Sequence, residues 1–338
     1  LVLSLVSILW TINEVWMINA ENGDRIKYTN ANQTLHRLIN AGPINKFILG
    51  SPRHSNTIKY GIVLLVISAA SEVDLRKEIR QQWASVHASG NLETEKALVI
   101  FLVGRSPDLN TEAEVYRDLL QIDIEETYRN QVYKVEAGFL WLKENVRSEF
   151  VAKIDSDTVV HIDRLYMELK IFEKKRRSNN FVICSIYEES EPYRDEYAKW
   201  YTSYADFPGS RYPRFCAGSG YVMSRVAFEN ILGEMGKHHV LEVEDVFFTG
   251  IVAEKVVYHV HDGGLVASRY TKSSPCDTHG FPVQSVLCTH DQFAESRYKK
   301  NITAAWEQLQ QPICGKAGAI VFTSFTLLFH CVVMSIIY

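Results

Sequence analysis

The chain contains 338 residues, of which 46% are hydrophobic, 22% charged and 12% aromatic. This composition is typical of a folded globular protein and excludes a disordered or collagen-like chain. The 36 basic and 40 acidic side chains leave a formal charge of -4. That charge argues against a protein that binds nucleic acid by neutralising many phosphates, but it allows the local binding of one small anion.

Both ends of the chain are apolar. Residues 1–12 carry no charged side chain, and residues 317–338 contain no Asp, Glu, Lys or Arg. A membrane-spanning helix needs about 20 apolar residues. We therefore expect residues 1–19 to form a membrane anchor, with a cleaved signal peptide or a soluble helix as alternatives. The role of the C-terminal segment stays open between a second span and a lipid-anchor signal.

A polar segment leads from the N-terminal run to the first folded elements. Residues 20–57 are interrupted by Gly and Pro, which predicts a stem. Residues 61–67 and 97–103 are continuous apolar runs, as expected for buried strands of a parallel sheet. Between them, residues 72–86 place apolar side chains at the spacing of one helical face. Together these segments predict a βαβ unit.

The alternation of helices and strands continues along the chain. We expect helices over 112–122, 131–146 and 162–175, and strands over 150–154 and 181–186. Alternating strands and helices predict an α/β domain with a mainly parallel central sheet. We assign residues 58–312 to this single domain.

Cysteine usage and glycosylation sequons bear on the cellular compartment. None of the six cysteines belongs to a Cys-x-x-Cys pair, so the sequence does not support a zinc ribbon or a thioredoxin-like site. Sequons at Asn32 and Asn301, together with the apolar N-terminus, favour the secretory pathway, where disulfides persist. The sequence leaves the pairing of the cysteines open.

Two carboxylates follow the strand predicted over 150–154. Asp155 and Asp157 stand one residue apart, and ligands of open α/β sheets bind beyond the carboxyl ends of strands. Oxygen ligands of this kind can hold a hard divalent cation, which would bridge a diphosphate. The alternative is a turn that caps the next helix.

A second acidic cluster covers residues 242–246 and precedes an apolar stretch. One carboxylate of this cluster could act as a general base toward a reacting hydroxyl. The alternative is that these acids occupy the first turn of a helix and stabilise its dipole.

Three further features have both a functional and a structural interpretation. Gly218 and Gly220 lie among aromatic residues that could stack on a sugar, and they permit either a turn or a close backbone approach. Arg76 and Arg80 share one face of a predicted helix, where they could grip a phosphate or face solvent. His290 is either a ligand or a structural residue.

Taken in order, seven short segments resemble motifs of the β1,3-glycosyltransferase family of galactosyltransferase type. They are Arg-x-x-x-Arg-x-x-Trp at 76–83, Phe-Leu-Val-Gly at 101–104, the acidic stretch 116–128, Asp-Ser-Asp at 155–157, Lys-Trp-Tyr at 199–201, the Gly- and Tyr-containing run 212–224, and Glu-Asp-Val at 244–246. Lys134 matches a lysine of the family's next helix. The resemblance spans about residues 60–310, and the order makes the set specific.

The resemblance implies a GT-A fold, a UDP-sugar donor and Mn²⁺. It implies inverting transfer of galactose or N-acetylglucosamine to an oligosaccharide, glycolipid or glycoprotein by a type II Golgi membrane protein with a lumenal catalytic domain. Asp245 matches the catalytic base, and Asp155, Asp157 and His290 match the metal site. Donor-binding residues are expected at Arg76, Arg80, Lys134, Lys153 and Ser156, and acceptor-binding residues at Trp200, Tyr201, Gly218, Gly220 and Glu244.

This sequence departs from the family pattern at two positions. Ser156 replaces the middle acid of the triplet, but both outer acids remain. Val252 stands near a position where many members carry a cysteine, so Cys216 could pair differently. Two rival functions are a non-catalytic glycan-binding or chaperone-like protein on the same scaffold, which the retained acids argue against, and a metal-dependent phosphohydrolase, which leaves the aromatic segments unexplained.

Overall fold

The structure is a computed structural model that describes residues 47–49, 58–176, 178–257, 259–262, 266–267, 285–288 and 302–310. The predicted membrane anchor at 1–19 and the C-terminal segment 317–338 lie outside these residues, as do Asn32, Asn301 and His290. Within the described ranges, no helix combines the length and the apolar character needed to cross a membrane.

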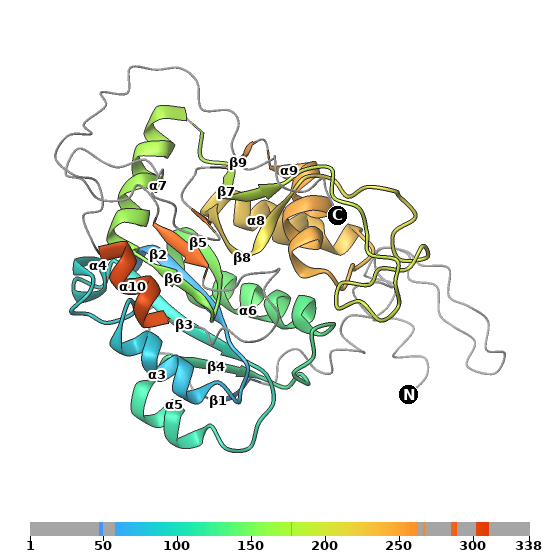
Figure 1. Cartoon of the computed structure of the whole chain (residues 1–338). Helices are drawn as coiled ribbons and strands as arrows, with labels where there is room; N and C mark the ends of the chain where they lie inside the picture. The colour runs from blue at the N-terminus through green and yellow to red at the C-terminus, as the bar shows by residue number, and fades with distance from the viewer. Residues whose placement is uncertain are drawn as a thin grey trace, which may run out of the picture.

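A central sheet of eight strands organises the described chain (Figure 1). Its order is β1-β4-β3-β2-β5-β8-β7-β9. Neighbours pair in parallel from β4 to β5, whereas β8 runs antiparallel to both β5 and β7. The strands are β1 (Phe47–Leu49), β2 (Lys59–Ile67), β3 (Ala97–Val103), β4 (Leu119–Ile122), β5 (Arg147–Asp155), β7 (Phe181–Tyr187), β8 (Phe215–Ser224) and β9 (His259–Asp262). The predicted α/β class with a mainly parallel sheet is confirmed.

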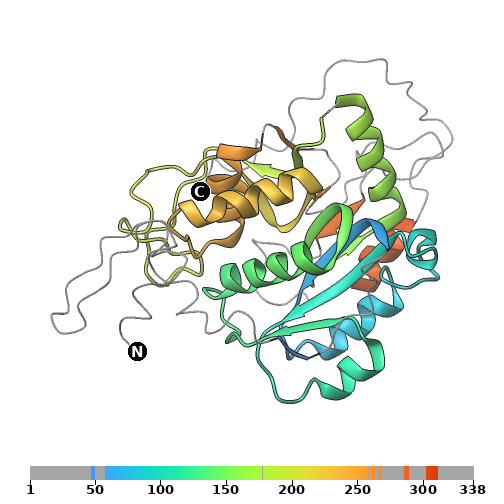
Figure 2. The ribbon, with the colours of Figure 1, turned by 180° about the vertical axis from the view of Figure 1, so that it is seen from behind.

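Helices cover both faces of this sheet (Figures 1 and 2). One layer contains α3 (Val73–Gln81), α4 (Gly90–Glu93), α5 (Asn110–Tyr116), α7 (Ile162–Arg176) and α10 (Ile302–Gln310). The other contains α6 (Gln131–Asn145), α8 (Arg225–Glu234), the 3₁₀-helix η1 (Met235–Lys237), the π-helix η2 (Val246–Val252) and α9 (Ala253–Val256). A small second sheet joins β10 (Val266–Ala267), β11 (Val286–Cys288) and β6 (Thr158–Val160).

The helices on both faces of the sheet explain why the central strands are continuously apolar. In β2, Val63 and Leu65 pack in the core under α6, whereas Ile62 and Leu64 pack in the core under α3 and α7. Successive side chains of a strand point to opposite faces, so a strand that is covered on both sides needs apolar residues at every position.

Three predicted features differ from the structure. The helix expected over 112–122 ends at Tyr116, because Arg117 adopts a left-handed conformation with a φ of 51°. The following residues form β4, and all four are buried. Gly218 and Gly220 lie within β8 rather than in a turn. The predicted stem also contains β1, which pairs with β4.

A disulfide joins the two strands next to the predicted site. Cys184 on β7 is bonded to Cys216 on β8, with 5.5 Å between their Cα atoms. This bond resolves the pairing of Cys216, which the sequence left open.

Candidate active site

The predicted acids lie at the carboxyl ends of the parallel strands. Asp155 is the last residue of β5 and stands opposite Ile67, the last residue of β2. Ser156 and Asp157 form the turn into β6. The side chains of Asp155 and Asp157 are half-buried, so this edge carries two carboxylates that are partly open to solvent.

One buried lysine connects three segments of the site. The Nζ of Lys153 lies 2.7 Å from Asp155 Oδ1, 3.1 Å from Glu244 Oε2 and 2.6 Å from the carbonyl oxygen of Gly218. Burial alone would lower the pKa of Lys153, but the charges of Asp155 and Glu244 outweigh it and raise that pKa. Lys153 therefore stays charged and ties β5 to β8 and to the acidic segment. All three N–H groups of its ammonium are thus engaged inside the protein, and the expected role of Lys153 in binding the donor sugar nucleotide stays a prediction.

Glu244 is an internal residue of this cluster. It is 4% exposed, and its Oε1 accepts a hydrogen bond of 2.5 Å from the hydroxyl of Tyr221. Its other oxygen faces Lys153. Both oxygens are thus engaged inside the protein, and the expected acceptor-binding role of Glu244 stays a prediction. Burial raises the pKa of Glu244.

Asp245, the next residue, also lies against β8, but it is half-buried where Glu244 is buried. It caps the π-helix η2, because its Oδ1 accepts a 2.9 Å hydrogen bond from the N–H of Val246. Burial and the neighbouring charge of Glu244 raise the pKa of Asp245 to about 7, although Lys153 opposes the shift. A carboxylate with a pKa near the working pH suits general-base catalysis, while the capping contact also satisfies the alternative role at a helix start.

The two glycines of β8 allow neighbouring groups to approach closely. A Cβ on Gly218 would lie 2.9 Å from Asp245 Oδ2, and a Cβ on Gly220 would lie 3.1 Å from Ile154 Cδ1. Gly218 is half-buried beside the candidate base, and its role toward an acceptor stays a prediction. Gly220 is buried and packs closely against Ile154 of β5, and its acceptor-binding role stays a prediction.

Aromatic side chains border the site on the side of residues 197–204. The ammonium of Lys199 lies over the rings of Tyr128, at 4.8 Å, and Trp200, at 5.5 Å. Burial and the charges of Asp245 and nearby acids raise the pKa of Tyr128, which places its phenol in the same electrostatic environment. The acceptor-binding roles of Trp200 and Tyr201 stay predictions. The sequence reasoning missed Tyr128 as a site residue, although it ends one of the family-like motifs.

Two expected donor-binding residues hold the loop after β2. Lys134 donates to Ser68 O at 2.8 Å and to both carboxylate oxygens of Glu126 at 2.9 and 3.0 Å. Ser156 Oγ donates to Glu72 Oε2 at 2.8 Å. All three N–H groups of the Lys134 ammonium are used, so Lys134 stabilises the loop, and its expected contact with a phosphate stays a prediction. Glu72 and Glu126 were not identified from the sequence.

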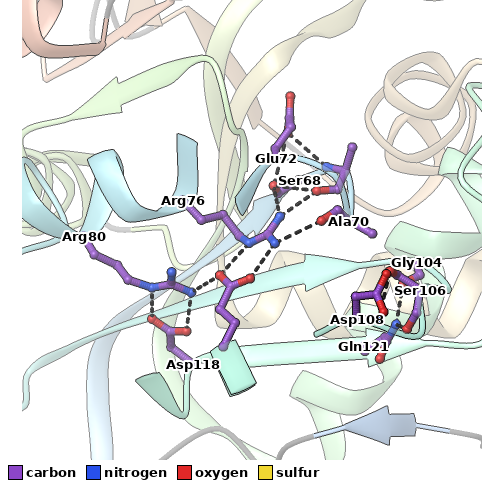
Figure 3. A network of polar contacts seen from close by, with 12 residues as sticks. Ser68, Ala70, Glu72, Arg76, Arg80, Gly104, Ser106, Asp108, Asp118 and Gln121 are labelled. Atoms are coloured by element: carbon purple, nitrogen blue, oxygen red, sulfur yellow. Dashed lines mark hydrogen bonds and ion pairs between the residues drawn. The ribbon is translucent and has the colours of Figure 1, made fainter. Parts of the chain in front are cut away.

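Arg76 and Arg80 form a buried ion-pair network (Figure 3). The five N–H groups of Arg76 donate to Glu112, Ser68 Oγ and the carbonyls of Ala69 and Ala70. Arg80 pairs with Glu112 and binds both carboxylate oxygens of Asp118 at 2.8 Å. The shared helical face is confirmed. Arg76 uses all its N–H groups inside the protein, whereas the buried Nη1 of Arg80 has no hydrogen-bond partner among the described residues. The phosphate-binding roles of both residues stay predictions.

Removing Arg76 should strongly destabilise the domain. Arg76→Met would leave the largely buried Glu112 with Arg80 as its only cationic partner in the network and would break a buried ion pair, which costs about 3–5 kcal/mol in the free energy of unfolding. Urea denaturation of purified protein measures this loss. Arg211→Met is the control, since it removes an exposed pair with Glu189 that should be worth less than about 1 kcal/mol. Equal losses in both variants would contradict the structural role of Arg76.

The two carboxylates at the end of β5 could hold a divalent cation if a bound substrate supplied further oxygen ligands. Among the described residues, no group of three or more His, Cys, Asp or Glu side chains could hold a metal ion. Asp155 and Asp157 nevertheless supply oxygen donors at a partly open edge. Small divalent cations are commonly held by one or two carboxylates together with substrate phosphates, so this pair fits such a cation bound with a diphosphate.

Comparisons with known proteins agree with the motif order. The Galactosyltransferase family model matches residues 74–263. Beta-1,3-galactosyltransferase 1 from Homo sapiens is 29% identical over 232 residues, which cover 65% of this chain and 69% of the relative. Beta-1,3-galactosyltransferase 5 from Homo sapiens is 28% identical over 202 residues, which cover 58% and 63%. A mannosyltransferase from Pyrobaculum calidifontis, solved with GDP-Man and Mn²⁺, aligns with a TM-score of 0.33 and 14% identity over 64% of this chain and 58% of that one.

Proposed function

Because this chain belongs to the galactosyltransferase family and is a hexosyltransferase, we propose that it is an inverting β1,3-glycosyltransferase. It would move galactose or N-acetylglucosamine from a UDP-sugar to a hydroxyl of an oligosaccharide, glycolipid or glycoprotein acceptor. The observation that carries this proposal is Asp245, a partly open carboxylate with a pKa of about 7 beside the strand edge that bears Asp155 and Asp157.

The arrangement of the site suits a single displacement. The ionised Asp245 would accept the proton of the acceptor hydroxyl while the acceptor oxygen bonds to C1 of the donor sugar and the bond from C1 to the diphosphate breaks. A base and a leaving group on opposite sides of C1 give inversion. Gly218 supports this role because it leaves room for Asp245 at the surface of β8.

A divalent cation, proposed to be Mn²⁺, would complete the donor side. Asp155 and Asp157 would hold it, and when bound it would neutralise the negative charge of the departing UDP. Lys153 supports this placement because its buried ammonium contacts Asp155 Oδ1 at 2.7 Å and so orients that carboxylate. The predicted ligand His290 lies outside the described residues.

The experiment that tests this function is a donor screen. UDP release is measured with UDP-Gal, UDP-GlcNAc and UDP-GalNAc, each with and without Mn²⁺ and with and without a mixture of glycan acceptors. We expect release with one donor that requires both the metal and an acceptor. Fast release without acceptor would instead indicate the phosphohydrolase, and no release with any pair would indicate the non-catalytic protein.

We also propose that the protein is a single-pass type II Golgi membrane protein with its catalytic domain in the lumen. The apolar residues 1–19 and the two sequons support this placement. The Cys184–Cys216 disulfide agrees with an oxidising compartment. Endoglycosidase sensitivity at Asn32 and Asn301 tests the orientation.

A further inference from the structure

The segment that follows Asp245 is a π-helix rather than an α-helix. η2 covers Val246–Val252, and Asp245 caps its start. π-Helical turns are rare and occur frequently at functional sites, because the wider turn changes where side chains and backbone groups point. Thr249 lies in the middle of this helix and is 1% exposed.

The hydroxyl of Thr249 bridges the candidate base and strand β8. Its Oγ1 donates to the carbonyl oxygen of Asp245 at 2.5 Å and accepts a hydrogen bond of 2.9 Å from the N–H of Cys216. Cys216 lies two residues before Gly218, where an added Cβ would lie 2.9 Å from Asp245 Oδ2. One buried hydroxyl therefore connects the backbone of Asp245 to the strand against which its carboxylate rests.

Strand β8 needs this bridge because its pairing with β7 is irregular at the same place. The register between the two strands shifts between Cys184 and Ile186, next to Cys216. A backbone N–H that is buried without a partner is costly, and the hydroxyl of Thr249 satisfies the N–H of Cys216. Because the site is buried, water could not readily replace that hydroxyl.

We propose that Thr249 is a positioning residue for catalysis, which fixes the carboxylate of Asp245 against Gly218 by hydrogen bonding to both Asp245 and β8. This inference rests on the proposed function, because it assumes that Asp245 is the base. Thr249 touches no reacting atom itself. Its effect is to hold the proton acceptor at one place, and a displacement of about 1 Å can cost about 10²-fold in rate.

The test compares variants that differ only in the hydroxyl. Thr249→Val keeps the shape of the side chain and removes both hydrogen bonds, whereas Thr249→Ser keeps the hydroxyl and removes the methyl group. We expect T249V to lower kcat by about tenfold or more, with the KM for the donor and the affinity for UDP with Mn²⁺ unchanged. T249S should keep kcat within about threefold of the wild type.

Several outcomes would overturn the inference. A T249V protein with wild-type kcat would do so, and so would equal losses in T249V and T249S, since the methyl group would then explain the effect. If T249V does not fold, Thr249→Ala and T249S give the same comparison, and equal kcat values in that pair also count against the proposal.

Asp245→Asn in the same assay separates this inference from the proposed function. If D245N keeps its turnover, the assignment of the base fails whatever Thr249 does. If D245N is inactive while T249V is fully active, the base stands and only the positioning role of Thr249 is wrong.

Discussion

Replacing Asp245 with asparagine should reduce the kcat of acceptor-dependent UDP release by about 10²- to 10⁴-fold, the usual contribution of a general base. Asparagine is similar in size and can still accept the hydrogen bond from the N–H of Val246, but it cannot take up the acceptor proton. Donor binding should persist, because Asp155 and Asp157 lie on a different segment, at the end of β5. Calorimetry with the UDP-sugar and Mn²⁺ checks this second expectation.

A matched control for this variant lies three residues away. Glu242 is an acid of the same cluster, but its side chain is 43% exposed and pairs with Arg129. Glu242→Gln should therefore change kcat by no more than about twofold. Equal effects of D245N and E242Q would show that the charge of the segment matters rather than the specific position of Asp245.

Replacing Lys153 with methionine should cost about 3–5 kcal/mol in the free energy of unfolding. The side chain of Lys153 is fully buried, and it is the counter-charge of Glu244, which is 4% exposed. Without the ammonium, Glu244 either keeps a buried negative charge or takes up a proton, and both outcomes oppose folding. Urea denaturation near neutral pH measures the loss.

A double variant tests whether the cause is the unpaired charge. Lys153→Met combined with Glu244→Gln removes both charges, so it should recover part of the stability lost in K153M. Lys59→Met serves as the control, because Lys59 is 65% exposed in its pair with Glu149 and should contribute less than about 1 kcal/mol. A K153M protein as stable as the wild type would contradict the central role given to this lysine.

The parts of the fold that could be predicted are those that depend on local pattern. The apolar runs of β2 and β3 are buried on both faces, so their sequence alone indicates strands of a covered sheet. The acids at the end of β5 follow directly from that reasoning, because ligand sites lie at this edge. The short strand β4 was missed, because its sequence Leu-Leu-Gln-Ile fits a helix as well as a strand.

The parts of the site that could not be predicted are contacts between distant residues. The spacing of Arg76 and Arg80 correctly placed them on one helical face, but Glu112 lies 36 residues from Arg76 and gives no local signal. In the same way, Glu244 and Asp245 are adjacent acids, but Glu244 is buried whereas Asp245 is half-buried. Only the positions of Lys153 and Tyr221 reveal that Glu244 is internal.

The pH dependence of acceptor-dependent turnover tests the assignment of Asp245 most directly. The pKa of Asp245 is raised to about 7, so the carboxylate is protonated and inactive as a base below that pH and ionised above it. We therefore predict that kcat/KM for the acceptor is constant above neutrality and falls about tenfold per pH unit below it. A wild-type kcat/KM that stays constant from pH 5 to 8, or a D245N protein with wild-type turnover, would contradict the assignment of Asp245 as the base of glycosyl transfer.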